Sequence, residues 1–398
     1  TASQRLRHGF IAVQIALAFI LLAGASLLRL SLDRALAVSP GFRVDHVLSG
    51  RISLPWKNYQ TTEAQDAFIQ RLLAEMGHLP GMQAAAAINS IPLSGTTQKS
   101  AITVKGYIPP PGESLRGHFS YGVAGDYFAA MGIPLREGRL LGVADAADRV
   151  RSCVVDEAFA RRYWPAGHAL GQRLTLGGEL AADEELFTVV GVVGGIKQED
   201  LTESEAQGAV YFPFRHRSDS TFYLVTRTSQ PPEALGAALQ NTVRRLDPEL
   251  PVNDLQSMEV RLASSLLTRR SPALLTSIFA GTALLLAVLG TYGVLSYAVM
   301  QRRREIGVRL ALGALPRQIA AQFLTLGGKL LAAGAVMGIV GAWISARTMQ
   351  GILFGIPRLP LSIIVGAGAI LALAALAACL LPIWRALRVA PAEALKND

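Results

Sequence analysis

Four long apolar runs constrain this chain more than any other feature of its sequence. They cover residues 10–28, 273–300, 330–349 and 361–381 and, short of Arg347 near the end of the third run, hold no Asp, Glu, Lys or Arg. Each is long enough for a helix that crosses a bilayer, which takes roughly 17 to 25 residues. The composition agrees, because only 17% of the residues are charged. We predict four transmembrane helices, over residues 10–30, 272–300, 326–349 and 361–382.

The first run could also be a signal peptide, because Arg5, Arg7 and His8 precede it like a basic leader. The run is longer than the apolar part of most signals, however, and no small-residue cleavage site follows it. We therefore favour an uncleaved span.

Basic residues in the short segments predict the topology, because arginine and lysine are held on the cytoplasmic side. They occur in both tails, residues 1–9 and 383–398, whereas the loop 350–360 carries only Arg358. The link between the second and third spans holds five: Arg302, Arg303, Arg304, Arg309 and Arg317. We predict a multi-pass protein of the bacterial inner (cytoplasmic) membrane with both termini cytoplasmic and a large periplasmic or extracellular domain. The net charge of +9 is then mainly a topology signal and does not indicate nucleic-acid binding.

The large outer region, residues 31–271, is predicted to be an α+β domain. A strand over 46–54, an amphipathic helix ended by Pro80 and Gly81, and the strand "MQAAAAINSI" form one β-α-β unit. The strand "TFYLVTRT", the helix "PEALGAALQNTVRRLD" and the strand "PVNDL" form a second. We expect a porter-like core of these two units with a strand-rich subdomain inserted at about 103–213, opened by the loop "GYIPPPGES".

Motifs for catalysis or metal binding are not found in the sequence. No GxxxxGK[ST] phosphate loop occurs, so we expect no ATP hydrolysis by this chain and no cofactor of its own. The six histidines have no partner at helical spacing, and no GxSxG motif occurs. Cys153 and Cys379 fall in the outer domain and the fourth span, so they are not expected to pair. We predict that the chain is not an enzyme.

A stripe of small residues follows the third span at a spacing of four: Gly334, Gly338 and Ala342. Such a stripe lets two helix backbones approach closely. It predicts a helix-packing face, with a second permease copy as a candidate partner.

Several segments together resemble the FtsX-like permease family with a MacB-type periplasmic core domain, a branch of ABC transporters. They include "RRREIGVRLALGA" and "LPIWRALRVAPAEAL" near the C-terminus, and "GDYFAAMGIPLREGR" and "VVDEAFARRYWPAGHALGQRL" in the outer domain. The similarity covers nearly the whole chain, with residues 272–391 as the FtsX-like permease domain, and is closest to a branch of duplicated permeases. Since the chain begins with Thr1, a fragment or the second half of a longer protein is one expectation.

The resemblance implies a mechanical function. In this family the segment corresponding to residues 301–325 couples a cytoplasmic ABC ATPase, which binds the ATP, to rearrangement of the outer domain during export or envelope substrate handling. A second permease copy or fused module and a periplasmic adaptor or substrate protein are the other expected partners. By position, the ATPase-contacting residues are Glu305, Ile306, Gly307, Arg309, Gly313 and Ala314. The alternative is a membrane sensor or scaffold whose outer domain binds a peptide, lipoprotein or cell-wall hydrolase without transport.

The arginine triplet Arg302 to Arg304 has a simpler interpretation, as a positive-inside anchor among anionic headgroups. Anchoring requires nothing of Glu305 or of the following turn. We expect a short helix ended by Gly313 and a new helix beginning at Pro316.

Overall fold

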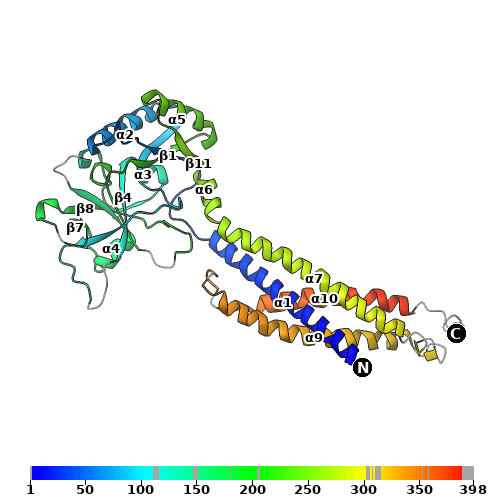
Figure 1. Cartoon of the computed structure of the whole chain (residues 1–398). Coiled ribbons are helices and arrows are strands. Elements are labelled where there is room, and N and C mark those ends of the chain that lie inside the picture. Colours follow the sequence, from blue (N-terminus) through cyan, green and yellow to red (C-terminus); the bar gives the residue numbers. More distant parts are fainter. Residues whose placement is uncertain are drawn as a thin grey trace. The chain divides into compact units, whose positions relative to one another are not determined.

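The computed structural model describes residues 2–110, 116–146, 151–179, 181–203, 207–301, 305–306, 308–309, 315–351, 353–356 and 358–387. The chain divides into two compact units, Thr1–Ala37 with Leu267–Asp398, and Val38–Leu266 (Figure 1). The first unit is built from helices, and the second from a sheet with helices packed on it.

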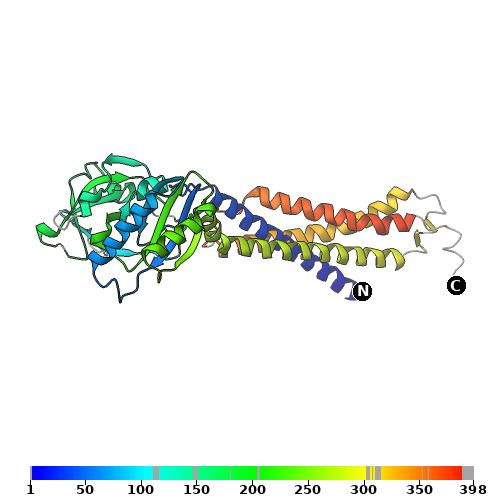
Figure 2. The same ribbon diagram turned by 90° about the horizontal axis from the view of Figure 1, so that it is seen from above.

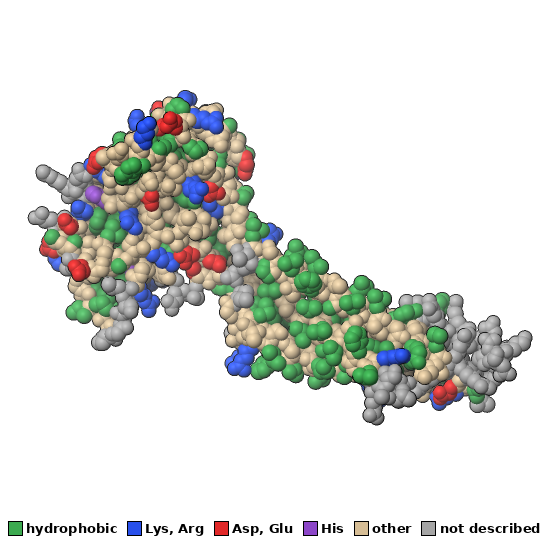
Figure 3. All heavy atoms as spheres, in the orientation of Figure 1, with side chains coloured by type: hydrophobic (Ala, Val, Ile, Leu, Met, Phe, Trp, Pro, Cys, Tyr) green, Lys and Arg blue, Asp and Glu red, His purple; other side chains and the backbone are tan. Residues whose placement is uncertain are grey.

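The helical unit contains the four apolar helices that the sequence predicts. They are α1 (Ala2–Leu36), α7 (Leu267–Gln301), α9 (Pro316–Thr348) and α10 (Leu361–Leu387). All four are long and apolar enough to cross a membrane. Figure 2 shows them side by side, and Figure 3 shows hydrophobic side chains over the sides of this unit. At 1.5 Å per residue, the 35 residues of α7 extend about 50 Å, well beyond a hydrocarbon core of about 30 Å.

Helix α1 lies at the centre of the helical unit. Its most apolar window is 56% buried, against 17% for α7 and 28% for α9. Ile15 and Phe19 are almost fully buried and belong to one apolar cluster with Leu330 and Ala342 of α9. The other three helices therefore pack around the N-terminal one.

The small-residue stripe of α9 faces α1 of the same chain. A Cβ atom at Gly334 would lie 2.6 Å from Cβ of Ile15, and one at Gly338 would lie 2.5 Å from Cβ of Phe19. Ala342 is 1% exposed in the same contact region. The helix that this stripe packs against is thus within the chain, and the stripe offers no face to a second permease copy, because α1 already covers it.

The second unit, Val38–Leu266, is called the outer unit below. It contains a four-stranded antiparallel layer made by the two predicted β-α-β units. The first is β1 (Val47–Ser53), α2 (Thr62–Gly77) and β2 (Met82–Ile88), and the second is β10 (Thr221–Thr228), α5 (Pro232–Leu246) and β11 (Val252–Ser257). The strand order β11-β1-β10-β2 interleaves the two units, as in ferredoxin-like folds. Figure 1 shows α2 and α5 together on one face of this layer.

The helices of this layer follow their sequence patterns. Phe68, Leu72 and Met76 of α2 are fully buried against the strands. Thr61 caps the helix, because its side chain accepts a hydrogen bond from the backbone N–H of Ala64 at 3.3 Å. The amphipathic pattern therefore fixes which side of α2 enters the core.

The inserted subdomain is a closed sheet. Its strands are β3 (Lys99–Val104), β4 (Gly117–Gly125), β6 (Ser152–Asp156), β7 (Arg173–Leu176), β8 (Phe187–Val193) and β9 (Ala209–Pro213). They follow the order β4-β3-β7-β8-β6-β9, and β9 pairs in parallel with β4 to close the ring. The short strand β5 (Leu135–Gly138) adds to β8. Two short helices, α3 (Tyr127–Met131) and α4 (Glu157–Tyr163), follow β4 and β6.

The insertion begins earlier than the expected residue 103. Strand β3 starts at Lys99 and pairs with β4 and β7, so it already belongs to the closed sheet. The segment "GYIPPPGES", of which residues 111–114 lie outside the described part, lies between β3 and β4 and does not open the subdomain. The partial alternation of residues 100–107 predicts a strand but does not say which sheet the strand joins.

Candidate functional site

The candidate coupling site lies at the end of the helical unit where α7 ends and α9 begins. After Gln301, residues Glu305, Ile306, Val308 and Arg309 have helical backbone. Of the predicted ATPase-contacting residues, Gly307, Gly313 and Ala314 lie outside the described residues, as do residues 302–304.

Ile306 is an internal anchor in this segment. Its side chain is 5% exposed and belongs to an apolar cluster with residues of three helices: Leu295 and Val299 of α7, Ile319 and Phe323 of α9, and Cys379 of α10. The expectation that Ile306 touches an ATPase therefore differs from the structure, because a buried side chain presents no surface to a partner. Its burial instead ties the segment to α7, α9 and α10.

Glu305 and Arg309 are on the exposed side of the same segment. Nη2 of Arg309 lies 2.6 Å from Oε1 of Glu305, at the (i, i+4) spacing, and each side chain is about half exposed at 50% and 47%. Such a pair stabilises a helix by only about 0.3 to 0.5 kcal/mol. Val308 and Leu315, exposed at 40% and 45%, add apolar surface beside it. Because the ion pair adds little to helix stability, we interpret these exposed charged and apolar side chains as a surface for contact with a partner.

The first turn of α9 is fixed by Pro316 and Gln318. Pro316 occupies the first turn, as the sequence predicts. The side-chain oxygen of Gln318 accepts a hydrogen bond from the backbone N–H of Leu315 at 3.3 Å. The backbone N–H of Gln318 donates to the Leu315 carbonyl at 2.9 Å. Gln318 and Phe323 were missed by sequence reasoning, although the spacing of Ile319 and Phe323 at i and i+4 is a usable signal.

In the outer unit, the residues just before α7 are held by a buried arginine. Helix α6 (Met258–Ser265) is capped by Ser257, whose side chain accepts a hydrogen bond from the backbone N–H of Val260. Arg261 of α6 is 3% exposed, and its Nη2 contacts Oδ2 of Asp254 at 2.8 Å and Oγ of Ser49 at 3.2 Å. The guanidinium also lies 5.3 Å from the centre of the Tyr223 ring. Arg261 thus joins α6 to β11, β1 and β10.

The residues that follow α1 are fixed in the same outer unit. The N–H of Lys197 donates to the Pro40 carbonyl at 2.9 Å, and the N–H of Arg43 donates to the Met131 carbonyl at 2.8 Å. Gly41 has a positive φ of 83° and lies so close to the Gly195 carbonyl that no Cβ fits between them. The segment after α1 is therefore attached to α3 and to the residues that follow β8, and the segment before α7 to strands of the sheet.

The structure offers no metal centre within the described residues, where no three His, Cys, Asp or Glu side chains come together. Cys153 is fully buried in β6, and burial raises the pKa of its thiol. His118 is also buried, which lowers its pKa, and its ring contacts the Tyr163 hydroxyl at 2.7 Å. Cys153 thus belongs to the apolar core of the closed sheet, and His118 connects β4 to Tyr163 of α4.

Comparison with known protein families identifies both parts of the chain. Residues 11–242 match the model of the MacB-like periplasmic core domain, and residues 277–391 match the FtsX-like permease C-terminal domain. The chain belongs to the FtsX-like permeases with a MacB-like periplasmic core. Permeases of this type are components of ABC transporters.

Two relatives illustrate the range of this family. The chain is 24% identical over 278 residues to the pyoverdine export ATP-binding/permease protein PvdT of Pseudomonas putida, covering 67% of this chain and 41% of that protein. It is 27% identical over 298 residues to the uncharacterized ABC transporter permease YvrN of Bacillus subtilis, covering 70% of each. This chain thus spans less than half the length of the first relative.

Among solved structures, the periplasmic region of MacB from Actinobacillus actinomycetemcomitans is similar. It matches at a TM-score of 0.37 and 14% identity, covering 57% of this chain and 95% of that one.

Proposed function

We propose that this chain is a non-catalytic permease subunit that couples ATP hydrolysis by a separate cytoplasmic ATPase to movement of its outer domain. One observation carries the proposal: the exposed Glu305–Arg309 pair sits on a segment that buried Ile306 ties to α7, α9 and α10. A force applied at the exposed pair would therefore move these helices together, because a packed apolar cluster transmits displacement.

Helix α7 supplies the path towards the outer domain. It continues without a break from Gln301 back to Leu267, directly after α6. Arg261 then connects α6 to three strands of the outer sheet. The proposed transmission runs from Glu305 through α7 to this anchor, and it requires no nucleotide site in this chain.

The proposal includes a placement in the bacterial inner membrane. We place both termini and residues 301–325 in the cytoplasm, on the basis of the basic residues in those segments. The ATP is bound by the partner ATPase. Helix α7 buries only 17% of its most apolar window within the chain, which leaves an apolar face for lipid or for a second permease copy. The family and the names of export proteins among the relatives support export or envelope substrate handling as the task.

The proposal is tested by purifying the full chain in nanodiscs with ABC ATPase subunits from the same bacterium. We expect one ATPase to associate, and Glu305→Arg to lower permease-dependent ATP hydrolysis at least tenfold. A matched control is Asp183→Arg, which removes an exposed carboxylate paired with Lys105 at 2.6 Å in the outer domain. If no ATPase associates, or if Glu305→Arg and Asp183→Arg behave alike, the proposed coupling surface is wrong.

A further inference from the structure

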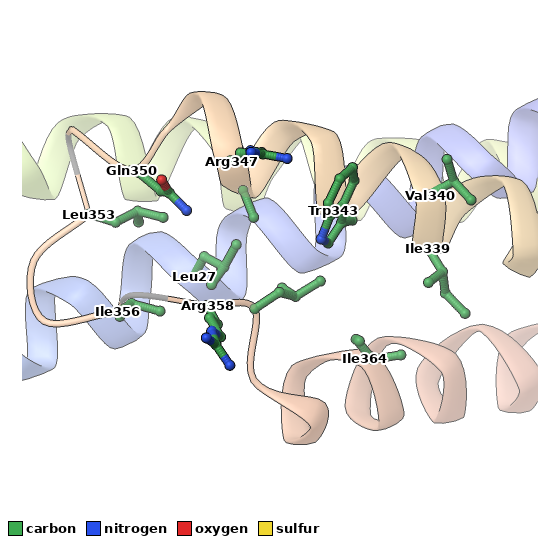
Figure 4. Close-up of a pocket in the computed structure, with 12 residues that line it drawn as sticks. Leu27, Ile339, Val340, Trp343, Arg347, Gln350, Leu353, Ile356, Arg358 and Ile364 are labelled. Carbon is green, nitrogen blue, oxygen red and sulfur yellow. The ribbon is translucent and has the colours of Figure 1, made fainter.

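A hollow of about 810 Å³ lies at the opposite end of the helical unit from the coupling site. It is lined by α1, α9, the loop that follows α9, and α10 (Figure 4). Ile339 and Trp343 project from α9 and Ile364 from α10, with Leu27 of α1 alongside. Most of the lining is aliphatic or aromatic, so the hollow suits an apolar ligand.

Described residues of the loop that completes the hollow contact helix α1. Arg34 of α1 donates a hydrogen bond from Nη1 to the carbonyl of Gly355, and the N–H of Phe354 donates to Oγ of Ser31 at 2.9 Å. Leu353 and Ile356 are buried at 8% and 5% exposure in the apolar cluster that also holds Leu27. These contacts hold the described loop residues against α1 and so reduce the entropy that a ligand would have to remove on binding.

Two arginines line this apolar hollow. Arg347 lies over the Trp343 ring, with its guanidinium carbon 5.4 Å from the ring centre, and Arg358 extends from the loop. Both side chains are exposed, and neither has a carboxylate within ion-pair distance among the described residues. The sequence explains this, because residues 315–387 contain no Asp or Glu, and the single acidic residue of α1, Asp33, does not line the hollow.

Arginines without an ion-pair partner among the described residues run against the usual charge distribution of membrane proteins at this end. With residues 301–325 in the cytoplasm, Arg347 and Arg358 lie at the outer end of the bundle, where the positive-inside rule disfavours them. Trp343 is 54% exposed next to Arg347, and tryptophan favours the level of the lipid headgroups. Together these residues place cationic groups at headgroup depth and aliphatic groups at acyl-chain depth.

We propose that this hollow binds an anionic glycerophospholipid from the surrounding leaflet. Arg347 and Arg358 supply the positive charge that attracts its anionic headgroup, because a guanidinium group binds phosphate oxygens through paired N–H donors. The acyl chains lie along Ile339, Val340 and Ile364. Zwitterionic lipids bind less well, since no lining residue is acidic and none can pair with their ammonium group. This inference rests on the membrane orientation given under the proposed function, but it does not require the proposed ATPase coupling.

The test uses the full chain, delipidated in detergent and titrated with phosphatidylglycerol or phosphatidylcholine while bound lipid is counted by native mass spectrometry. We expect phosphatidylglycerol to bind at least tenfold more tightly. The double variant Arg347→Gln with Arg358→Gln is expected to lose roughly thirtyfold in affinity for phosphatidylglycerol, about 2 kcal/mol. Equal binding of the two lipids by the unmodified chain overturns the proposal.

A matched control removes the same charge nearby. Arg29 of α1 and Arg270 of α7 are exposed at the same end of the bundle and do not line the hollow. The double variant Arg29→Gln with Arg270→Gln is expected to keep its preference for phosphatidylglycerol. Loss of preference in this control too points to unspecific charge attraction and contradicts a built site. Competition by millimolar inorganic phosphate as effective as that by the lipid indicates a free-anion site and contradicts the lipid assignment.

Discussion

Nη2 of Arg261 lies 2.8 Å from Oδ2 of Asp254, and this pair fastens α6 to the edge of the outer sheet. The Arg261 side chain is only 4% exposed. Because water cannot solvate its charge, the hydrogen bonds to Asp254 and Ser49 must stabilise it. Asp254 has a positive φ of 50° and lies where the pairing of β1 and β11 shifts register. This irregularity turns the Asp254 carboxylate towards Arg261 of α6.

Removing the carboxylate should weaken this fastening strongly. Asp254→Ala leaves the buried guanidinium of Arg261 without its ionic partner, and we expect a loss of about 2 to 4 kcal/mol in the stability of the outer domain. Thermal unfolding of the full chain in detergent measures the effect. Asp183→Ala, which breaks an exposed pair with Lys105, is expected to cost less than about 1 kcal/mol. Similar losses for the two variants would show that Arg261 is not a special anchor.

The close approach of α1 and α9 predicts a sharp difference among glycines of one helix. Gly334→Ala and Gly338→Ala each place a methyl group about 2.5 Å from Ile15 or Phe19, which we expect to cost about 1 to 3 kcal/mol. Gly328→Ala on the same helix meets nothing within 4 Å and should be neutral or stabilising. Melting temperatures of the three variants in detergent test this, and an equal response at all three positions would contradict the packing.

Ile306 is predicted to matter for coupling through its packing. Ile306→Ala removes a side chain that is 5% exposed, so the resulting cavity should destabilise the segment by about 2 to 4 kcal/mol. Val308→Ala, two residues away and 40% exposed, is the control for stability only and should leave the free energy of unfolding nearly unchanged. We expect Ile306→Ala to bind the ATPase but to reduce permease-dependent hydrolysis. Normal permease-dependent ATP hydrolysis by Ile306→Ala would show that the packing of Ile306 is not needed for coupling.

Asp145 should give the outer domain a pH dependence in acid. Hydrogen bonds from the Arg139 guanidinium, at 2.6 and 2.8 Å, and from the Gly142 N–H lower the pKa of Asp145 from 3.8 to about 2. A lowered folded-state pKa stabilises the fold above the unfolded value, and that stability is lost as the pH falls through the folded value. The contribution should therefore disappear between about pH 4 and about pH 2.

The Asp145→Asn variant checks this assignment. It should be less stable at pH 7 by about 1 to 2 kcal/mol and should show a smaller stability change between about pH 4 and about pH 2 than the unmodified chain. Urea unfolding at several pH values measures both quantities. An unchanged acid dependence in Asp145→Asn would assign the titration to another group.

The helical unit and the ferredoxin-like layer could be predicted from the sequence because their signals are local. Uninterrupted apolar runs fix the four long helices, and the spacing of Phe68, Leu72 and Met76 fixes the buried side of α2. The closed sheet could not be predicted, because the parallel pairing of β4 with β9 joins segments about 90 residues apart. Nothing in the sequence near Lys99 shows which sheet β3 enters.

The site was predictable in part. Charge and helical spacing identify Glu305 and Arg309 as a surface pair, but they do not show that Ile306 is buried, because its neighbours come from three separate helices. The burial of Arg261 could not be predicted from the sequence for a related reason. An arginine in an amphipathic helix is normally exposed, and its burial here depends on the register shift that positions Asp254.

The most direct measurement is amide hydrogen exchange of residues 252–266 in the permease–ATPase complex in nanodiscs, with and without ATP. Coupling through α7 and Arg261 predicts that ATP changes exchange in β11 and α6 of the unmodified chain, and that Glu305→Arg abolishes this change while the outer domain stays folded. An unmodified complex that hydrolyses ATP with no change in these amides, or an equal change in Glu305→Arg, would contradict the account.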